Sequence, residues 1–440
     1  MPVLAPSTKE RPTLWLCFAF SADLTEATGQ EQVSFTPDRQ VCELVFRLWP
    51  NKPETADEGS KLVIDAAQVD GADVKPVVTS AGAPKGKTGT LATLKLPKCA
   101  PADKEIKIGL SFTLTLAQRS TERVGASQAD EMAWAGTAFP LLAWVPGKGW
   151  AKDPAVDLVG EMATSPAFTI QELRVVAATG MKVAGSGKET SSSDDDPPGF
   201  STHVFASDAV RDVAVSVGRM SVSTFDVGGV SVHLVEPLTG SKAGTQAWTR
   251  AVSSALPELT RELGPLPYRD LWLTVTPAQT TGMEFPGAVL FGDAPVETLD
   301  TLIAHELAHQ WFYALVGNNQ AANPWLDEAF AQYVTATVLR QKARYLAMPI
   351  SAKVRNKVGG SMSFYAKLGS SNLYAEGVYD QGTKMLFAVE NSIGAPAMRS
   401  ILRSYITAEA NKISSPADFA KAFAGEPKAV SILRKYGAVS

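Results

Sequence analysis

Residues 297–316, ETLDTLIAHELAHQWFYALV, decide how the rest of this sequence is interpreted, because they hold two of the chain's four histidines. The stretch predicts one helix that ends at Gly317, with Glu297 and Asp300 near its start, where the helix dipole favours acidic groups. Its apolar stripe recurs at every fourth position, at Ile303, Leu307, Trp311 and Leu315.

The two histidines, His305 and His309, are four residues apart, so both imidazoles project from one face of the helix. This geometry suits two ligands of one tetrahedral Zn²⁺ ion. Glu306 lies beside the first ligand, where its carboxylate can take a proton from a metal-bound water. A structural zinc site would use four protein ligands and needs no such glutamate. The pattern therefore favours a catalytic site with one zinc ion per chain.

A third ligand is expected on the next helix. The polar stretch 318–323 breaks the first helix, and Pro324 opens a second one, PWLDEAFAQYVTATVLRQKARY. Glu328 lies in its first turn, with 18 residues between it and His309. The two helices can fold back on each other and complete a site of two histidines, one glutamate and water. Asp327 is the alternative ligand; otherwise it caps the helix or supports the ligands.

The first half of the chain has the pattern of β-strands. Apolar and polar residues alternate from 106 to 116, which is typical of a strand with one buried face. Similar short strands are expected at 41–49, 91–96 and 210–218. Residues 185–199, GSGKETSSSDDDPPG, lack apolar periodicity and predict a mobile surface loop. Its three aspartates favour a solvated loop tip over a calcium site.

The character of the chain changes near residue 220. Strands are still expected at 230–235 and 271–276, but helical patterns appear between them, and the chain is mostly helical from about 296 onward. We therefore expect a multidomain α+β protein. A β-rich N-terminal domain would cover 1–220, and a mixed α/β, then α-helical, catalytic domain would cover 221–440.

Length and composition exclude several classes of protein. A chain of 440 residues can form two or three domains, and its net charge of −4 argues against a nucleic-acid partner or an acidic-membrane binder. No apolar run approaches the ~20 residues that cross a bilayer. The N-terminus has no leader pattern, so we expect a cytoplasmic protein, or an exported one whose leader was removed.

The three cysteines, Cys17, Cys42 and Cys99, cannot all pair within the chain. Cys17 and Cys42 both lie in strand-like segments and could pair in an oxidising compartment. Buried free thiols are the favoured interpretation.

Two further motifs lie on either side of the histidine stretch: TGMEFPG at 281–287 and VYDQG at 378–382. Together with HELAH and the spaced WLDEAFAQY, they resemble the gluzincin peptidases of the aminopeptidase N / leukotriene-A hydrolase family. The first motif resembles that family's Gly-x-Met-Glu exopeptidase motif, and the second its Val-x-Tyr-x-x-Gly segment. Four elements in the family's order are far more specific than HExxH alone.

The resemblance implies a saddle-like β-rich domain followed by a thermolysin-like catalytic domain. Many relatives continue into a large C-terminal helical domain, whereas this chain stops at Ser440. It therefore resembles a bacterial short form, and we expect a more open site that admits longer peptides.

The resemblance also implies roles for residues outside the metal site. Tyr379 would donate a hydrogen bond to the oxyanion of the transition state. Glu284 would pair with the α-ammonium group of the substrate and so select free N-termini. Backbone groups of Gly282 and Met283 would bind the substrate as an added strand. Glu131 would be a second anchor for the amine.

We therefore expect a zinc aminopeptidase that acts on peptides with a free N-terminus. Three residues depart from the family pattern, at Thr281, Phe285 and Ala329, but none of these departures removes a reacting group. The alternatives are a zinc endopeptidase with an open cleft and a non-catalytic binding member of the fold. The preferred N-terminal residue and the oligomeric state do not follow from these motifs.

Overall fold

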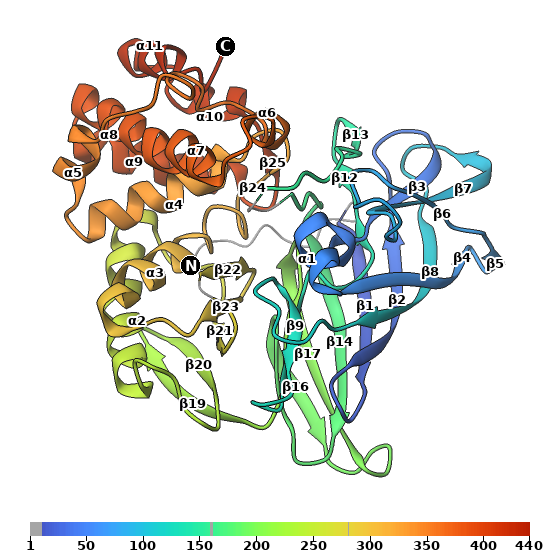
Figure 1. Cartoon of the computed structure of the whole chain (residues 1–440). Helices are drawn as coiled ribbons and strands as arrows, with labels where there is room; N and C mark the ends of the chain where they lie inside the picture. Colours follow the sequence, from blue (N-terminus) through green and yellow to red (C-terminus); the bar gives the residue numbers. More distant parts are fainter. Residues whose placement is uncertain (1–10, 159–161, 280) are drawn as a thin grey trace.

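The computed structural model describes residues 11–158, 162–279 and 281–440, which form a β-rich half and a mixed half lying side by side (Figure 1). Blue-to-green strands make up the first half, and a yellow-green sheet with orange and red helices makes up the second. This arrangement agrees with the predicted multidomain α+β fold. The expected boundary near residue 220 falls between β18 (Ala214–Gly218) and β19 (Met220–Val227), and it stays a prediction.

The largest sheet of the β-rich half has eight strands in the order β16-β17-β14-β1-β2-β8-β4-β5. Its strands are β1 (Thr13–Phe20), β2 (Glu26–Phe35), β4 (Lys61–Val69), β5 (Ala72–Asp73), β8 (Ile106–Thr115), β14 (Phe168–Ala178), β16 (Lys188–Ser193) and β17 (Phe200–Val210). In β8, buried side chains alternate with more exposed ones, as the period-two pattern predicts.

Two four-stranded sheets and a short hairpin complete the β-rich half; the sheets have the orders β15-β18-β10-β9 and β11-β3-β7-β6. Their further strands are β3 (Val41–Arg47), β6 (Val77–Thr79), β7 (Leu91–Ala100), β9 (Val124–Ser127), β10 (Met132–Gly136), β11 (Leu141–Leu142), β12 (Trp144–Val145), β13 (Gly149–Trp150) and β15 (Lys182–Gly185). Two short helices, η1 (Trp49–Asn51) and α1 (Pro53–Glu58), follow β3.

The structure corrects the prediction of free cysteines, and the pair that forms is not the one considered. Cys42 forms a disulfide with Cys99, whereas Cys17 is a free thiol. Cys42 and Cys99 lie on the neighbouring antiparallel strands β3 and β7, with their Cα atoms 4.0 Å apart. Cys17 lies on β1 of the eight-stranded sheet, so strand-like character alone could not identify the correct partner.

Two predictions in the β-rich half were wrong, one of a loop and one of a strand. Residues 188–193 form the edge strand β16 rather than a mobile loop, because their backbone pairs with β17 although they carry no apolar pattern. The three aspartates occupy the exposed turn that follows, as expected for a solvated tip. The segment 210–218 is not one strand. It ends β17 at Val210, leaves Arg211 and Asp212 outside any strand, and resumes as β18.

The mixed half begins with a five-stranded sheet in the order β19-β20-β21-β23-β22. Its further strands are β20 (Val230–Pro237), β21 (Asp270–Thr276), β22 (Gly282–Phe285) and β23 (Ala288–Gly292). The strands β20, β21 and β23 are parallel, and α2 (Thr245–Leu263) connects the first two. The strand β22 pairs antiparallel with β23 and forms one edge of the sheet.

The rest of the chain is mostly helical, as predicted. Its elements are α3 (Val296–Ala308), β24 (Gly317–Asn318), α4 (Trp325–Val338), α5 (Lys342–Ala347), α6 (Met362–Lys367), α7 (Ser371–Ala375), the π-helical turn η2 (Glu376–Asp380), α8 (Gln381–Ile393), α9 (Ala395–Glu409), β25 (Ile413–Ser414), α10 (Pro416–Ala422) and α11 (Pro427–Lys435). The strands β24 and β25 pair in parallel.

Both helices of the metal motif are shorter than predicted. The first stops at Ala308, and residues 309–316 form a buried turn in which Tyr313 has a φ of 101°. This left-handed conformation cannot continue an α-helix. The second helix ends at Val338, and Arg340, with a φ of 57°, separates it from α5.

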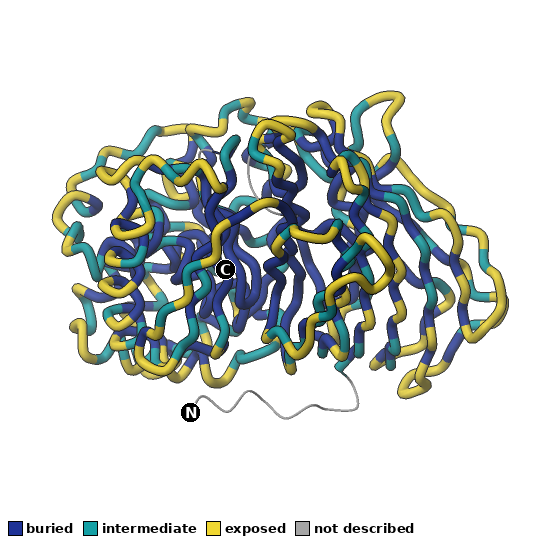
Figure 2. The backbone as a smooth tube through the Cα atoms, turned by 90° about the horizontal axis from the view of Figure 1, so that it is seen from below, coloured by how far each residue is buried: buried dark blue, intermediate teal, exposed yellow. Residues whose placement is uncertain are grey.

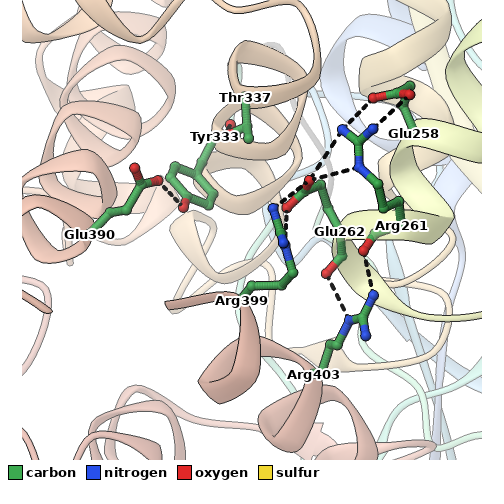
Figure 3. A network of polar contacts seen from close by, with 8 residues as sticks. All are labelled: Glu258, Arg261, Glu262, Tyr333, Thr337, Glu390, Arg399 and Arg403. Carbon is green, nitrogen blue, oxygen red and sulfur yellow. Dashed lines mark hydrogen bonds and ion pairs between the residues drawn. The ribbon is translucent and has the colours of Figure 1, made fainter. Parts of the chain in front are cut away.

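One continuous cluster of buried side chains runs through both halves. Figure 2 shows buried backbone through the middle of the molecule and exposed segments around its rim. Within the mixed half, Glu262 near the end of α2 accepts two hydrogen bonds from Arg399 of α9, at 2.7 and 3.0 Å (Figure 3). Among the described residues, no helix is both long and apolar enough to cross a membrane.

Candidate metal centre

Three ligand atoms predicted from the sequence converge at one point. The Nε2 atoms of His305 and His309 are 3.2 Å apart, and Glu328 Oε2 lies 3.3 Å from the first and 3.4 Å from the second. Ligand atoms bound tetrahedrally at 2.0–2.1 Å from a metal are about 3.3 Å apart. The triangle therefore has the size that a single tetrahedral metal ion requires.

Local structure orients these ligands. His305 lies in the last turn of α3, and His309 caps its end, where its Nδ1 donates to Phe312 O at 3.1 Å. That bond leaves Nε2 free to bind a metal. Glu328 lies in the first turn of α4, which packs against α3.

The alternative ligand, Asp327, does not join this group. Its Oδ1 accepts from the backbone amide of Glu328 at 2.8 Å, and its Oδ2 accepts from Gln320 Nε2 at 3.0 Å. Burial and the nearby Glu328 carboxylate raise the pKa of Asp327. Asp327 therefore holds the first turn of α4 in place, which agrees with the supporting role given as its second interpretation.

The centre concentrates negative charge in a buried place. Glu284 and Glu306 lie close to His309, and both carboxylates are at least nine-tenths buried, as is that of Glu328. Burial alone lowers the pKa of His309, but the surrounding carboxylates outweigh burial and raise it well above the usual histidine range. Buried charges require compensation, so three carboxylates at one point favour a bound cation.

Glu306 lies against the backbone of the edge strand β22. A Cβ atom added to Gly282 would lie 2.2 Å from Glu306 Cγ and 2.3 Å from its Cδ. Contacts this short do not occur, so any other residue at position 282 would force the Glu306 carboxylate to shift. The Gly-x-Met-Glu motif and the HExxH motif therefore meet in space, although the sequence separates them.

The register of the edge strand shows which of its backbone groups face away from β23. Gly292 N donates to Thr281 O at 2.6 Å, so the antiparallel alternation turns the backbone groups of Met283 toward β23. The backbone groups of Gly282 and Glu284 then face the open side of the strand. The register agrees with the prediction that Gly282 offers its backbone groups to an added strand. It turns those of Met283 away from the open side and places those of Glu284 there.

Tyr379 lies in the π-helical turn η2 and faces the metal ligands. Its ring stacks on His305, with the centroids 5.9 Å apart and the planes at 21°. The ring of Tyr374 packs edge-on against the ring of Tyr379, with the centroids 5.7 Å apart. Together these contacts hold the phenol beside the metal ligands.

These groups line a cavity of about 530 Å³ between the two halves of the molecule. The β-rich half contributes Lys52, Glu122 and Arg123, which sequence reasoning missed because no motif marks them. Lys52 Nζ lies 3.7 Å from Glu122 Oε2. Glu131, the expected second amine anchor, is exposed and pairs with Arg219 at 3.1 Å, outside this cavity. That expectation was wrong.

The helices α3 and α4 bring two histidines and one glutamate together beside the edge strand, which is the ligand set expected of the gluzincin class. Residues 282–435 match the model of the Peptidase family M1 domain. The predicted resemblance to the aminopeptidase N family of gluzincins is confirmed over this segment.

The relatives are similar over part of their length. The chain is 29% identical to Aminopeptidase N of Lactobacillus delbrueckii subsp. lactis over 155 residues, which cover 32% of this chain and 17% of that protein. It is 29% identical to Membrane alanyl aminopeptidase of Heliothis virescens over 152 residues, which cover 31% and 15%. The chain thus spans less than a fifth of the length of these relatives.

The solved structure of an M1 zinc metallopeptidase from Deinococcus radiodurans superimposes with a TM-score of 0.68 at 18% identity. The superposition covers 98% of this chain and 94% of that one, so the fold is shared over nearly the whole length.

Proposed function

We propose that this protein is a zinc-dependent aminopeptidase that removes N-terminal residues from peptides. The observation that carries the proposal is the triangle formed by His305, His309 and Glu328, whose sides of 3.2–3.4 Å suit one tetrahedral zinc ion. A zinc ion held there supplies Lewis acidity to a bound water and to the substrate carbonyl.

Glu306 is proposed as the general base. It takes the proton from the attacking water and returns it to the leaving amine. Its support is its position beside His309 and against Gly282, between the metal ligands and the edge strand. Tyr379, stacked on His305, is proposed to donate a hydrogen bond to the oxyanion as negative charge develops.

Glu284 is proposed to select substrates with a free N-terminus. It extends from the edge strand into the same buried cluster, where a carboxylate can pair strongly with an α-ammonium group. Glu122, which lines the same cavity from the β-rich half, is proposed as the second amine anchor in place of Glu131. The open side of β22 is proposed to receive the peptide backbone as an added strand.

We also propose which type of domain each half of the molecule forms. The β-rich half is proposed as the saddle-like domain over 1–220, and the five-stranded sheet with α3 and α4 as the thermolysin-like catalytic domain over 221–440. Supporting this assignment, the proposed ligands and general base come from α3 and α4 and β22 borders the same cavity, while the β-rich half supplies one wall.

The test compares one peptide in two forms, with a free and with an acetylated N-terminus, using Glu306→Gln protein as the blank. The expected result is loss of the first residue from the free form alone, with activity abolished by a chelator and restored by zinc. Internal cleavage of the acetylated form would favour an endopeptidase. No cleavage of either form by zinc-loaded protein would favour a non-catalytic binding member of the fold.

Glu284→Gln separates amine selection from metal chemistry. We expect it to weaken cleavage of the free peptide by about 10²-fold, since a charge-assisted pair is lost in a buried site. Glu131→Gln is the matched control, because that carboxylate is exposed and outside the cavity. Equal effects of the two substitutions would contradict the proposed role of Glu284.

A further inference from the structure

The buried turn at residues 310–316 is the segment that leads out of the metal site. It follows the ligand His309 directly, and Phe312 O in this turn accepts the hydrogen bond from His309 Nδ1. The orientation of that imidazole therefore depends on where the Phe312 carbonyl lies. The turn also contains Tyr313, whose φ of 101° is a conformation that side chains with a Cβ rarely adopt.

Two consecutive residues of the β-rich half hold this turn. Arg211 and Asp212 lie on the short segment between β17 and β18, and both side chains are buried. They reach the turn from more than a hundred positions earlier in the chain.

Arg211 uses its guanidinium to bind backbone carbonyls. It donates to Ala314 O at 3.2 Å and Leu315 O at 3.3 Å, and these carbonyls belong to a turn that cannot satisfy them by helical bonds. It also donates to Ser165 O and Lys412 O, both at 3.1 Å. A Cβ on Gly317 would lie 2.1 Å from Arg211 Nη1, so this glycine leaves room for the guanidinium rather than ending a helix.

Asp212 holds the strained residue itself. Its Oδ2 accepts a hydrogen bond from Tyr313 OH at 2.8 Å and a second one from Thr137 Oγ1 at 2.7 Å. Its Oδ1 accepts from Val213 N at 2.7 Å. The Thr137 hydroxyl in turn accepts from Arg123, which lines the substrate cavity. The network therefore joins a wall of the cavity to the turn after the metal ligand.

We propose that Arg211 and Asp212 form a clasp that positions the metal ligand His309 through this turn. The clasp fixes Tyr313 in its left-handed conformation, Tyr313 fixes the adjacent Phe312 carbonyl, and that carbonyl orients the imidazole. Arg211, Asp212 and Tyr313 are positioning residues and do not touch the substrate. The inference rests on the proposed function, because the change it predicts is a change in the affinity of the proposed zinc site.

The test removes one oxygen atom. Tyr313→Phe deletes the hydrogen bond to Asp212 and keeps the ring. The matched control is Tyr333→Phe, since Tyr333 OH donates to the buried Glu390 Oε2 at 2.6 Å within the helical part (Figure 3). Both substitutions lose a buried tyrosine–carboxylate bond, but only the first lies next to the metal turn.

Two quantities are measured: zinc affinity, by competition with a chelating dye, and amide exchange of residues 310–316 in the metal-free protein. We expect Tyr313→Phe to weaken zinc binding by about tenfold. Its turn amides should also exchange faster by a factor of about five to ten. Tyr333→Phe should change neither quantity, although it lowers the melting temperature. Arg211→Lys, which keeps the charge but loses the planar fork, should act in the same direction as Tyr313→Phe.

The outcomes separate the clasp from the proposed function. Unchanged turn exchange and zinc affinity in Tyr313→Phe, or equal changes in Tyr333→Phe, would overturn the clasp. Wild-type protein that binds no zinc would instead overturn the proposed function, while the exchange measurement would still decide whether the clasp holds the turn.

Discussion

At the scale of single residues, one glycine near the proposed metal centre has no room for a Cβ atom. Gly282 faces Glu306 so closely that any added Cβ atom would displace the carboxylate. The metal ligands His305, His309 and Glu328 are not part of that contact. A change at this position should therefore displace the proposed general base and leave metal binding intact.

Gly282→Ala should reduce kcat by about 10²-fold or more, since a positioned general base contributes 10²–10⁴-fold. Zinc content, measured by atomic absorption, should stay at one ion per chain. Gly109→Ala in β8 is the control, because the nearest atom to its added Cβ lies 4.0 Å away. Normal kcat in Gly282→Ala would mean that Glu306 is not the base.

A second residue far from the metal controls stability with pH. Glu31 on β2 is 2% exposed, and its Oε2 has no hydrogen-bond partner in the described part of the chain. Its neighbours are apolar and include Leu14, Val33 and Phe139. Burial raises the pKa of Glu31 well above the usual glutamate range. The folded protein therefore holds this proton more tightly than the unfolded chain.

The sign of the effect follows from linkage. Below the ordinary pKa of glutamate both states are protonated, and Glu31 costs no ionisation energy. As the pH rises from that value through the raised folded pKa, the unfolded chain ionises first and the folded state loses stability. Glu31→Gln should therefore unfold like wild type at pH 4 and more slowly, or at higher urea concentration, at pH 8. Glu26→Gln, exposed at the start of the same strand, should shift neither curve.

At the scale of secondary-structure elements, a buried carboxylate of α2 binds an arginine of α9, beside two backbone carbonyls of α2 that bind Arg403. Glu262 accepts both hydrogen bonds from Arg399, and its side chain is only 11% exposed (Figure 3). Removing the arginine would leave a largely buried charge with weaker compensation. The exposed pair of Arg174 and Glu172 offers a comparison, because both of its side chains are more than a third exposed.

Arg399→Ala should lower the free energy of unfolding by about 1–3 kcal/mol, the usual range for a lost hydrogen bond to a charged group. Arg174→Ala should cost about 0–1 kcal/mol, as surface pairs do. Urea denaturation of both variants measures the two losses in the free energy of unfolding. Equal losses would show that the bond between α2 and α9 contributes no more than a surface ion pair.

Elements with a clear apolar period could be predicted from the sequence. Strand β8 shows its period of two directly, and the triangle of His305, His309 and Glu328 follows from helical spacing and one chain reversal. Strand β16 could not be predicted, because it is polar and gains its structure from pairing with β17. The early end of α3 was missed for a similar reason: its turn is satisfied by Arg211, which lies far away in the sequence.

At the scale of the whole molecule, the site depends on both halves. The proposed metal ligands come from the mixed half, whereas Lys52, Glu122 and Arg123 reach the cavity from the β-rich half. No motif predicts these three residues, because the long-range packing that brings them to the cavity leaves no periodic pattern in the sequence. Since one continuous core joins the halves, we expect them to unfold together.

The disulfide between Cys42 and Cys99 tests this cooperativity. It joins residues 57 positions apart in the β-rich half, and neither cysteine lines the metal cavity. A crosslink over such a loop stabilises a protein by about 2–4 kcal/mol, chiefly by restricting the unfolded chain. The double variant Cys42→Ser and Cys99→Ser should melt at a lower temperature, with unchanged kcat well below the transition. Cys17→Ser is the control for losing a thiol.

If the halves unfold together, peptidase activity and strand structure will be lost at the same lowered temperature. Activity that outlasts the loss of strand structure would show that the mixed half folds and works without its β-rich wall.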